Sequence, residues 1–144
     1  MAVALLATLS IGVSSCSDDD NDGPGSTSLL IGTWQTVTIN TNETDQTPTE
    51  DVAYDNYRIS FYEDGTFKQE KRNNSSSPWH TFDEGYYKYT EEKIYVDYND
   101  GFGWEVIGRV LQLSENALVI EDKGYDYEDG YWYYKATLRR ISAD

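Results

Sequence analysis

The chain has 144 residues, of which 38% are hydrophobic and 15% aromatic, and its formal net charge is −15. This length suits one compact domain, whose core must draw on the 13 tyrosines and 4 tryptophans. The negative charge argues against nucleic acid as a partner, because phosphate binding needs clustered Lys and Arg, and the single cysteine excludes an internal disulfide and a Cys-rich metal site.

The first segment, residues 1–15, is apolar or small and carries no charged side chain. It is too short to span a bilayer comfortably but suits the apolar part of a signal peptide, although no Lys or Arg precedes it. It ends in Val13-Ser14-Ser15 before Cys16, which resembles a bacterial lipobox. The resemblance implies that Cys16 is lipidated, acquiring a multi-chain acyl (palmitate-type) anchor. The alternative is a small cysteine buried at the end of a core helix.

Residues 16–28 contain the lipidated cysteine and then an acidic, Gly- and Ser-rich stretch that predicts a flexible tether. Asp18, Asp20 and Asp22 have the spacing that opens an EF-hand loop, but the twelfth position, where a calcium-binding Glu belongs, is Leu29. The acidic run resembles instead the export tag of surface-exposed lipoproteins. We therefore expect an outer-membrane lipoprotein on the surface of a Gram-negative bacterium.

Residues 29–144 alternate between apolar and polar side chains and show no helical periodicity. Turns are predicted at Glu63-Asp64-Gly65, at Glu91-Glu92 and at Ser114-Glu115-Asn116, and a loop around His80. About eight strands follow, which predicts an all-β domain, a small antiparallel up-and-down β-barrel. The inward-facing positions are predicted to be Tyr57, Ile59, Phe61, Phe67, Tyr87, Tyr89, Ile94, Val96, Leu111, Leu113, Leu118, Ile120 and Tyr134.

Five segments in this region resemble, in their order and spacing, bacterial lipocalin-like lipoprotein domains: LIGTW (30–34), FYEDGTF (61–67), GYYKYTEEKIYV (85–96), LQLSENALVI (111–120) and YYKATLRRI (133–141). The resemblance implies that Trp34 closes the barrel floor and that an arginine of the last strand covers it. Alternation from Leu138 favours Arg140 over Arg139. The role of this pair is structural.

The barrel interior is the first candidate site. An eight-stranded barrel can be filled by its own side chains or can hold one small ligand. Buried tyrosine hydroxyls need hydrogen-bond partners, so we expect a cup that binds a small apolar or amphipathic molecule. The alternative is a packed barrel whose tyrosines reach the rim. The predicted lining residues are Tyr57, Phe61, Phe67, Tyr87, Tyr89 and Tyr134.

The second candidate is the acidic, aromatic stretch 121–134. Tyr125, Tyr127 and Trp132 could contact a protein or glycan at the cell surface, without an internal ligand. Five carboxylates could gather around calcium, or the stretch could be a solvated hairpin loop, which we favour: Glu121, Asp122, Asp126, Glu128 and Asp129. No catalytic motif is present. We expect a monomeric binding protein rather than an enzyme, without metal or cofactor, held to the membrane by the lipid on Cys16.

Overall fold

The computed structural model describes residues 27–128 and 130–142, so the predicted signal peptide, Cys16 and most of the tether lie outside the described residues. One helical turn and nine strands are present: α1 (Thr27–Leu30), β1 (Gly32–Asn42), β2 (Val52–Ala53), β3 (Tyr57–Phe61), β4 (Thr66–Lys71), β5 (His80–Thr90), β6 (Lys93–Asp97), β7 (Glu105–Leu113), β8 (Ala117–Asp126) and β9 (Gly130–Ile141). Within the described ranges, no helix is long and apolar enough to cross a bilayer.

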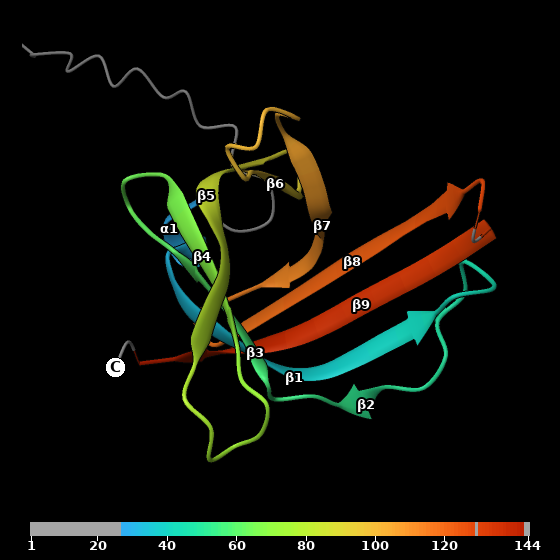
Figure 1. Ribbon diagram of the computed structural model, residues 1–144, viewed down its shortest axis with the longest axis horizontal. Helices are drawn as coiled ribbons and strands as arrows, with labels where there is room; N and C mark the ends of the chain where they lie inside the picture. Colours follow the sequence, from blue (N-terminus) through green and yellow to red (C-terminus); the bar gives the residue numbers. More distant parts are fainter. Residues whose placement is uncertain (1–26, 129, 143–144) are drawn as a thin grey trace, which may run out of the picture.

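The strands form a closed antiparallel barrel. β1 and β3 to β9 pair in chain order, and β9 returns to pair with β1. The short strand β2 pairs with the second half of β1, beside β3. Figure 1 shows β8 and β9 running side by side past β7 to the hairpin that joins them. The prediction of an all-β, up-and-down, eight-stranded barrel is confirmed.

The tight turns lie where the sequence indicated. Glu91 and Glu92 both have positive φ (52° and 61°), the backbone of a two-residue hairpin turn whose twist matches the adjoining strands. Between β3 and β4, Gly65 has φ 82° and the Asp64 carboxylate accepts hydrogen bonds from the Thr66 amide and hydroxyl. These local preferences fix the register of the hairpins.

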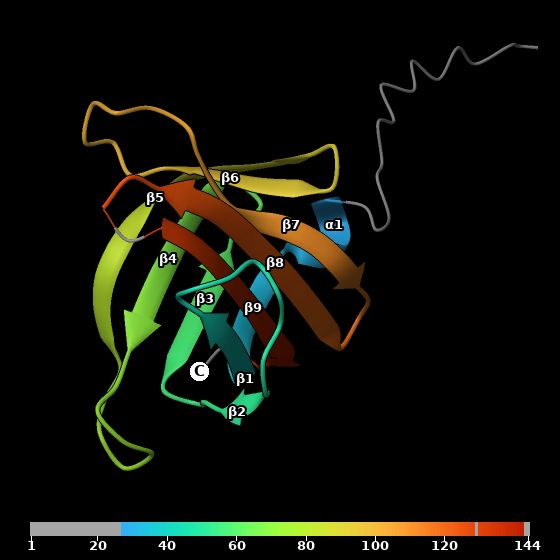
Figure 2. The same ribbon diagram turned by 90° about the vertical axis from the view of Figure 1, so that its right-hand side faces the viewer.

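The two ends of the barrel differ, and Figure 2 shows α1 at one of them. We call this end the floor. It holds α1 and the tight turns that join β3 to β4, β5 to β6 and β7 to β8. The other end, the mouth, holds the connections 43–56, 72–79 and 98–104 and the β8–β9 hairpin. His80, predicted in a loop, is the first residue of β5 and lies near the mouth.

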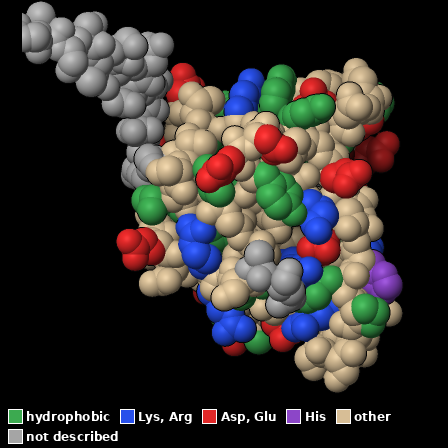
Figure 3. Space-filling model, turned by 90° about the vertical axis from the view of Figure 1, so that its left-hand side faces the viewer, with side chains coloured by type: hydrophobic (Ala, Val, Ile, Leu, Met, Phe, Trp, Pro, Cys, Tyr) green, Lys and Arg blue, Asp and Glu red, His purple; other side chains and the backbone are tan. Residues whose placement is uncertain are grey.

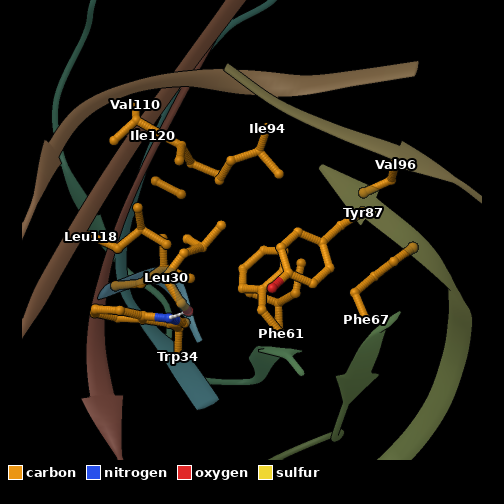
Figure 4. Close-up of a cluster of buried hydrophobic side chains, with 13 residues drawn as sticks. Leu30, Trp34, Phe61, Phe67, Tyr87, Ile94, Val96, Val110, Leu118 and Ile120 are labelled. Atoms are coloured by element: carbon orange, nitrogen blue, oxygen red, sulfur yellow. Dashed lines mark hydrogen bonds between the residues drawn. The ribbon is translucent and has the colours of Figure 1, made fainter. Parts of the chain in front are cut away.

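The core is a single cluster that follows the predicted alternation, except on β7. Figure 4 shows its side chains converging from opposite walls. Leu111, predicted to face inward, is 46% exposed, whereas Val110 is 2% exposed. The β7–β8 register shifts between Val110 and Gln112, so a β-bulge inserts one residue and reverses the alternation. The prediction for Leu111 was therefore wrong.

Candidate ligand-binding site

The floor is closed by Trp34. Its side chain has no exposed surface, and its indole Nε1 donates a hydrogen bond to the Leu30 carbonyl, 2.7 Å away. This bond ties α1 to β1 and satisfies the one polar atom of the indole. The Arg140 guanidinium lies over the indole ring, with Cζ 4.3 Å from its centroid. Arg139, its neighbour on β9, is exposed.

Arg140 also connects the chain segments around the floor. Its guanidinium donates hydrogen bonds to the backbone carbonyls of Leu29, Ile31 and Glu115. Gly32 makes room for this arrangement, because a Cβ at that position would meet Arg140 Nη1 at 2.2 Å and its φ of +133° disfavours other residues. Charge-assisted hydrogen bonds to carbonyls are stronger than neutral ones. The floor is thus rigid and closed.

Above the floor the barrel is hollow. A cavity of about 280 Å³ lies between the walls and extends as far as Tyr57 and Tyr134 on the mouth side. Three of the predicted site residues line it: Tyr57, Phe61 and Tyr134. The other lining residues come from seven strands, β3 to β9: Ile59, Gln69, Phe82, Ile94, Ile107, Leu118, Ile120, Ala136 and Leu138.

The other three predicted site residues do not line this cavity. Tyr87 packs edge-on against Phe61, with ring centroids 4.9 Å apart (Figure 4), and its hydroxyl donates to the Tyr62 carbonyl. Phe67 is fully buried against Tyr98 at 5.7 Å. Tyr89 packs against the core cluster. These three side chains pack against neighbouring residues of the barrel instead, and the cavity is lined by other residues of the same strands.

The cavity is apolar toward the floor and polar toward the mouth. Tyr57 and Tyr134 lie at the mouth ends of β3 and β9, whereas Phe61 and Leu138 lie near the floor. Burial raises the pKa of both tyrosines, so each hydroxyl keeps its proton at any physiological pH. No Lys or Arg lines the cavity within the described part of the chain. The site can therefore hold a molecule with an apolar body and one polar end.

Several lining residues were not predicted from the sequence. Phe82 and Ile107 point into the cavity from irregular positions, because the β4–β5 register shifts between Gln69 and Glu70 and the β6–β7 register shifts beside Ile94. Gln69 is polar but only 6% exposed, and it was not among the predicted inward-facing positions. Its spacing of two residues from Phe67 on β4 was the signal that could have placed Gln69 inside.

The β8–β9 hairpin carries an exposed aromatic cluster. The Tyr125 ring lies 5.7 Å from Tyr127 and 4.9 Å from Tyr131. Tyr127 is 96% exposed. Trp132, predicted as the third member, lies over Gly124 instead, where a Cβ would meet its ring at 2.8 Å. The cluster is therefore Tyr125, Tyr127 and Tyr131, hereafter the hairpin tyrosines.

The carboxylates of the same hairpin are spread apart. Among the described residues, no group of three or more His, Cys, Asp or Glu side chains is placed to hold a metal ion. Asp129 lies outside those residues. Burial raises the pKa of Asp122, which is paired opposite Tyr134 on the strand ladder. Asp122 therefore faces the same side of the sheet as Tyr134, near the cavity mouth.

One side of the barrel gathers cations, although the whole chain is acidic. Figure 3 shows Lys and Arg side chains in the lower half of one face. On the outer wall, the guanidinium groups of Arg58 and Arg72 lie over the Trp79 ring at 4.6 and 4.5 Å. Arg58 Nε is 2.7 Å from the carboxylate of Glu70, which is largely buried, and Arg72 pairs with Asp55. These contacts fix the 72–79 connection on the wall.

A closed, eight-stranded antiparallel barrel with an internal cavity and a tryptophan floor belongs to the class of small up-and-down β-barrels. The model of the lipocalin-like domain family matches residues 30–120, more than half of the chain. The chain belongs to the lipocalin-like domain family.

Solved structures with a similar fold include two bovine proteins. Bovine odorant-binding protein complexed with its natural ligand is 15% identical, with a TM-score of 0.46, over 85% of this chain and 78% of that one. The bovine lipocalin allergen Bos d 2 is 16% identical, with a TM-score of 0.45, over 81% of this chain and 76% of that one. No curated protein matches this chain.

Proposed function

We propose that this protein binds a small apolar or amphipathic molecule in the barrel cavity and that it does so as a lipid-anchored protein of the cell envelope. The cavity carries the first part of the proposal. Its floor half is apolar and its volume is about 280 Å³, roughly twice that of the engineered 150 Å³ apolar cavity that holds benzene. A ligand of about a dozen non-hydrogen atoms would fit.

A binding role is favoured over a catalytic one by the chemistry of the lining. The residues around the cavity offer phenols and one amide, but no carboxylate, imidazole or thiol. An acid–base mechanism needs a group that exchanges its proton near the working pH. The two tyrosines that line the cavity hold their protons well above that range.

The anchoring part rests on the lipobox-like sequence that ends at Cys16. A multi-chain lipid at this position attaches a protein stably to a membrane, and the acidic stretch behind it supports export to the surface. The proposed location is the outer membrane of a Gram-negative bacterium. The proposed state is a monomer, with the lipid on Cys16 as its one membrane contact.

Two experiments test these parts separately. Native mass spectrometry of the protein purified from its own envelope should show the chain plus a small organic molecule. The same preparation of an Ala136→Phe variant, whose ring would occupy the cavity, should lose that mass. A wild-type spectrum with the bare protein alone argues against the cavity function.

For the anchor, metabolic labelling with radioactive palmitate should mark the wild type and leave Cys16→Ser unlabelled. External protease should digest the anchored protein on intact cells. Equal labelling of both chains would contradict a lipid on Cys16, and protection from protease would contradict surface exposure.

The hairpin tyrosines favour a second candidate function, recognition of a protein or glycan. Exposed aromatic side chains in one cluster are typical of recognition surfaces, and Tyr125 and Tyr131 are each more than half exposed. A glycan array should distinguish this function. Binding lost in Tyr125→Ser and kept in Tyr62→Ser, which alters an exposed tyrosine of the β3–β4 turn at the floor, would support it.

A further inference from the structure

Two hydroxyl groups at the cavity mouth have no hydrogen-bond partner among the residues that the structure describes. Tyr57 and Tyr134 both line the cavity. Neither side chain forms a hydrogen bond with any residue in the described ranges. Both phenols are partly buried, and burial holds both protons in place. The cavity therefore presents two hydrogen-bond donors to whatever occupies it.

A donor that loses its water without gaining an acceptor costs binding free energy. A wholly apolar ligand that displaced water from Tyr57 and Tyr134 would leave two such donors. A ligand with an acceptor at its mouth end and an apolar body toward Phe61 and Leu138 would give at least one of these donors a partner. Because the lining is apolar toward the floor and polar toward the mouth, it orients the ligand.

The charges around the mouth disfavour an anionic end. Asp83 is paired opposite the lining residue Gln69 on the strand ladder, and Asp122 lies opposite Tyr134. Moving a carboxylate into the cavity would also remove its hydration, with no lining cation to compensate.

One cation does lie at the rim. Lys71 is paired opposite Tyr57 on the strand ladder, and its Nζ is 5.1 Å from the centroid of the Phe82 ring. Its side chain is exposed and is not part of the lining. Water screens a charge in that position, so we assign the recognition to the phenols rather than to Lys71.

We propose that the cavity selects a neutral ligand whose polar end accepts a hydrogen bond from Tyr57 or Tyr134, such as a ketone or an ester, over a fatty carboxylate of the same chain length. This proposal rests on the proposed ligand-binding function and adds the chemical class of the ligand.

The test uses four probes of nearly equal size: octan-2-one, its isostere 2-methyloct-1-ene, octan-2-amine and octanoate. Binding to the full chain carrying Cys16→Ser is followed at pH 8 through backbone amide chemical shifts. Octan-2-one should bind about fivefold to tenfold more tightly than the alkene, the equivalent of one neutral hydrogen bond. Octanoate should bind at least tenfold more weakly than the ketone.

Substitutions test which residues cause the preference for the ketone over the alkene. Tyr57→Phe and Tyr134→Phe should together reduce the ketone's advantage over the alkene to less than twofold, while alkene binding stays unchanged. Tyr131→Phe, which removes an exposed hydroxyl from the hairpin, should keep the full preference. Lys71→Met should leave the order of the four probes unchanged.

Three results would overturn the proposal. They are an octanoate or amine affinity equal to or above that of the ketone, a ketone preference that survives both Phe substitutions, and octanoate binding that Lys71→Met abolishes. Equal binding of all four probes would reject the selectivity and leave the binding function standing. Absence of shifts around the cavity with every probe would reject both.

Discussion

The floor and the mouth of this barrel are built from the same strands but are packed in opposite ways. At the floor, Trp34, Leu30 and Leu138 have almost no exposed surface, and Arg140 ties three backbone segments together. At the mouth, Tyr57 and Tyr134 are only partly buried beside a cavity. The floor contributes stability and closes the barrel, whereas the mouth keeps space and unpaired donors for a ligand.

Replacing one tryptophan at each end with alanine should give the largest difference in stability loss between the floor and the mouth. Trp34→Ala should lower the free energy of unfolding by about 3–5 kcal/mol, because it empties a fully buried site. Trp104→Ala, at a mouth connection where the indole is 45% exposed, should cost less than about 1 kcal/mol. Urea denaturation measures both, and equal losses would show that the ends are equally packed.

A smaller effect should separate two neighbouring arginines. Arg140→Met removes the cation over Trp34 and the hydrogen bonds to three carbonyls, and should cost about 2–3 kcal/mol in the free energy of unfolding. Arg139→Met changes an exposed residue one position away and should stay within about 0.5 kcal/mol. A stable Arg140→Met protein would show that Trp34 closes the floor without help.

On the wall between the two ends, Glu70→Gln should cost about 1–2 kcal/mol at pH 7. Burial of Glu70 would raise its pKa, but Arg58 and Lys68 outweigh burial and lower it. Because the folded pKa is the lower one, the stabilisation is complete above about pH 4.5 and is lost as pH falls through the folded value. The stability gap between wild type and variant, measured by denaturant titration, should be constant from pH 8 to 5 and narrow below 4.5.

The smallest change in stability, with a large change in binding, should come from filling the cavity. Ala136→Leu adds three carbon atoms at a lining position and should change the free energy of unfolding by less than about 1 kcal/mol. It should weaken octan-2-one binding at least tenfold. Ala117→Leu, near the floor and outside the lining, should leave the affinity unchanged. A large loss of stability with full affinity would place the ligand elsewhere.

The sequence predicted the fold because half-buried strands carry their orientation in the alternation of side chains. Trp34, Ile59 and Ile94 lie inside as that period requires, and the acidic and glycine turns lie between the strands. Alternation gave the wrong face at one of the positions predicted to lie inside. Leu111 faces water because a bulge adds a residue to β7, and no residue type in that stretch marks a bulge.

The site was harder to predict than the fold. Alternation places Tyr57, Phe61 and Tyr134 inside the barrel, and all three line the cavity. It cannot tell them from Tyr87 and Phe67, which also face inward but pack against Phe61 and Tyr98. That difference depends on how far opposite walls stand apart, which is a property of the closed barrel and not of any single strand.

The pairing of β9 with β1 has a consequence for the order of folding. Arg140 reaches the Ile31 carbonyl across 109 residues of chain, so the floor closes by joining segments from opposite ends of the domain. Contacts of such long range carry a loop-closure cost that must be met before they become stabilising, and they slow folding. The hairpins from β3 to β8 can form locally as the chain emerges. Until β9 pairs with them, β1 and β8 each have an unpaired strand edge. The chain is most prone to aggregate at that stage of folding.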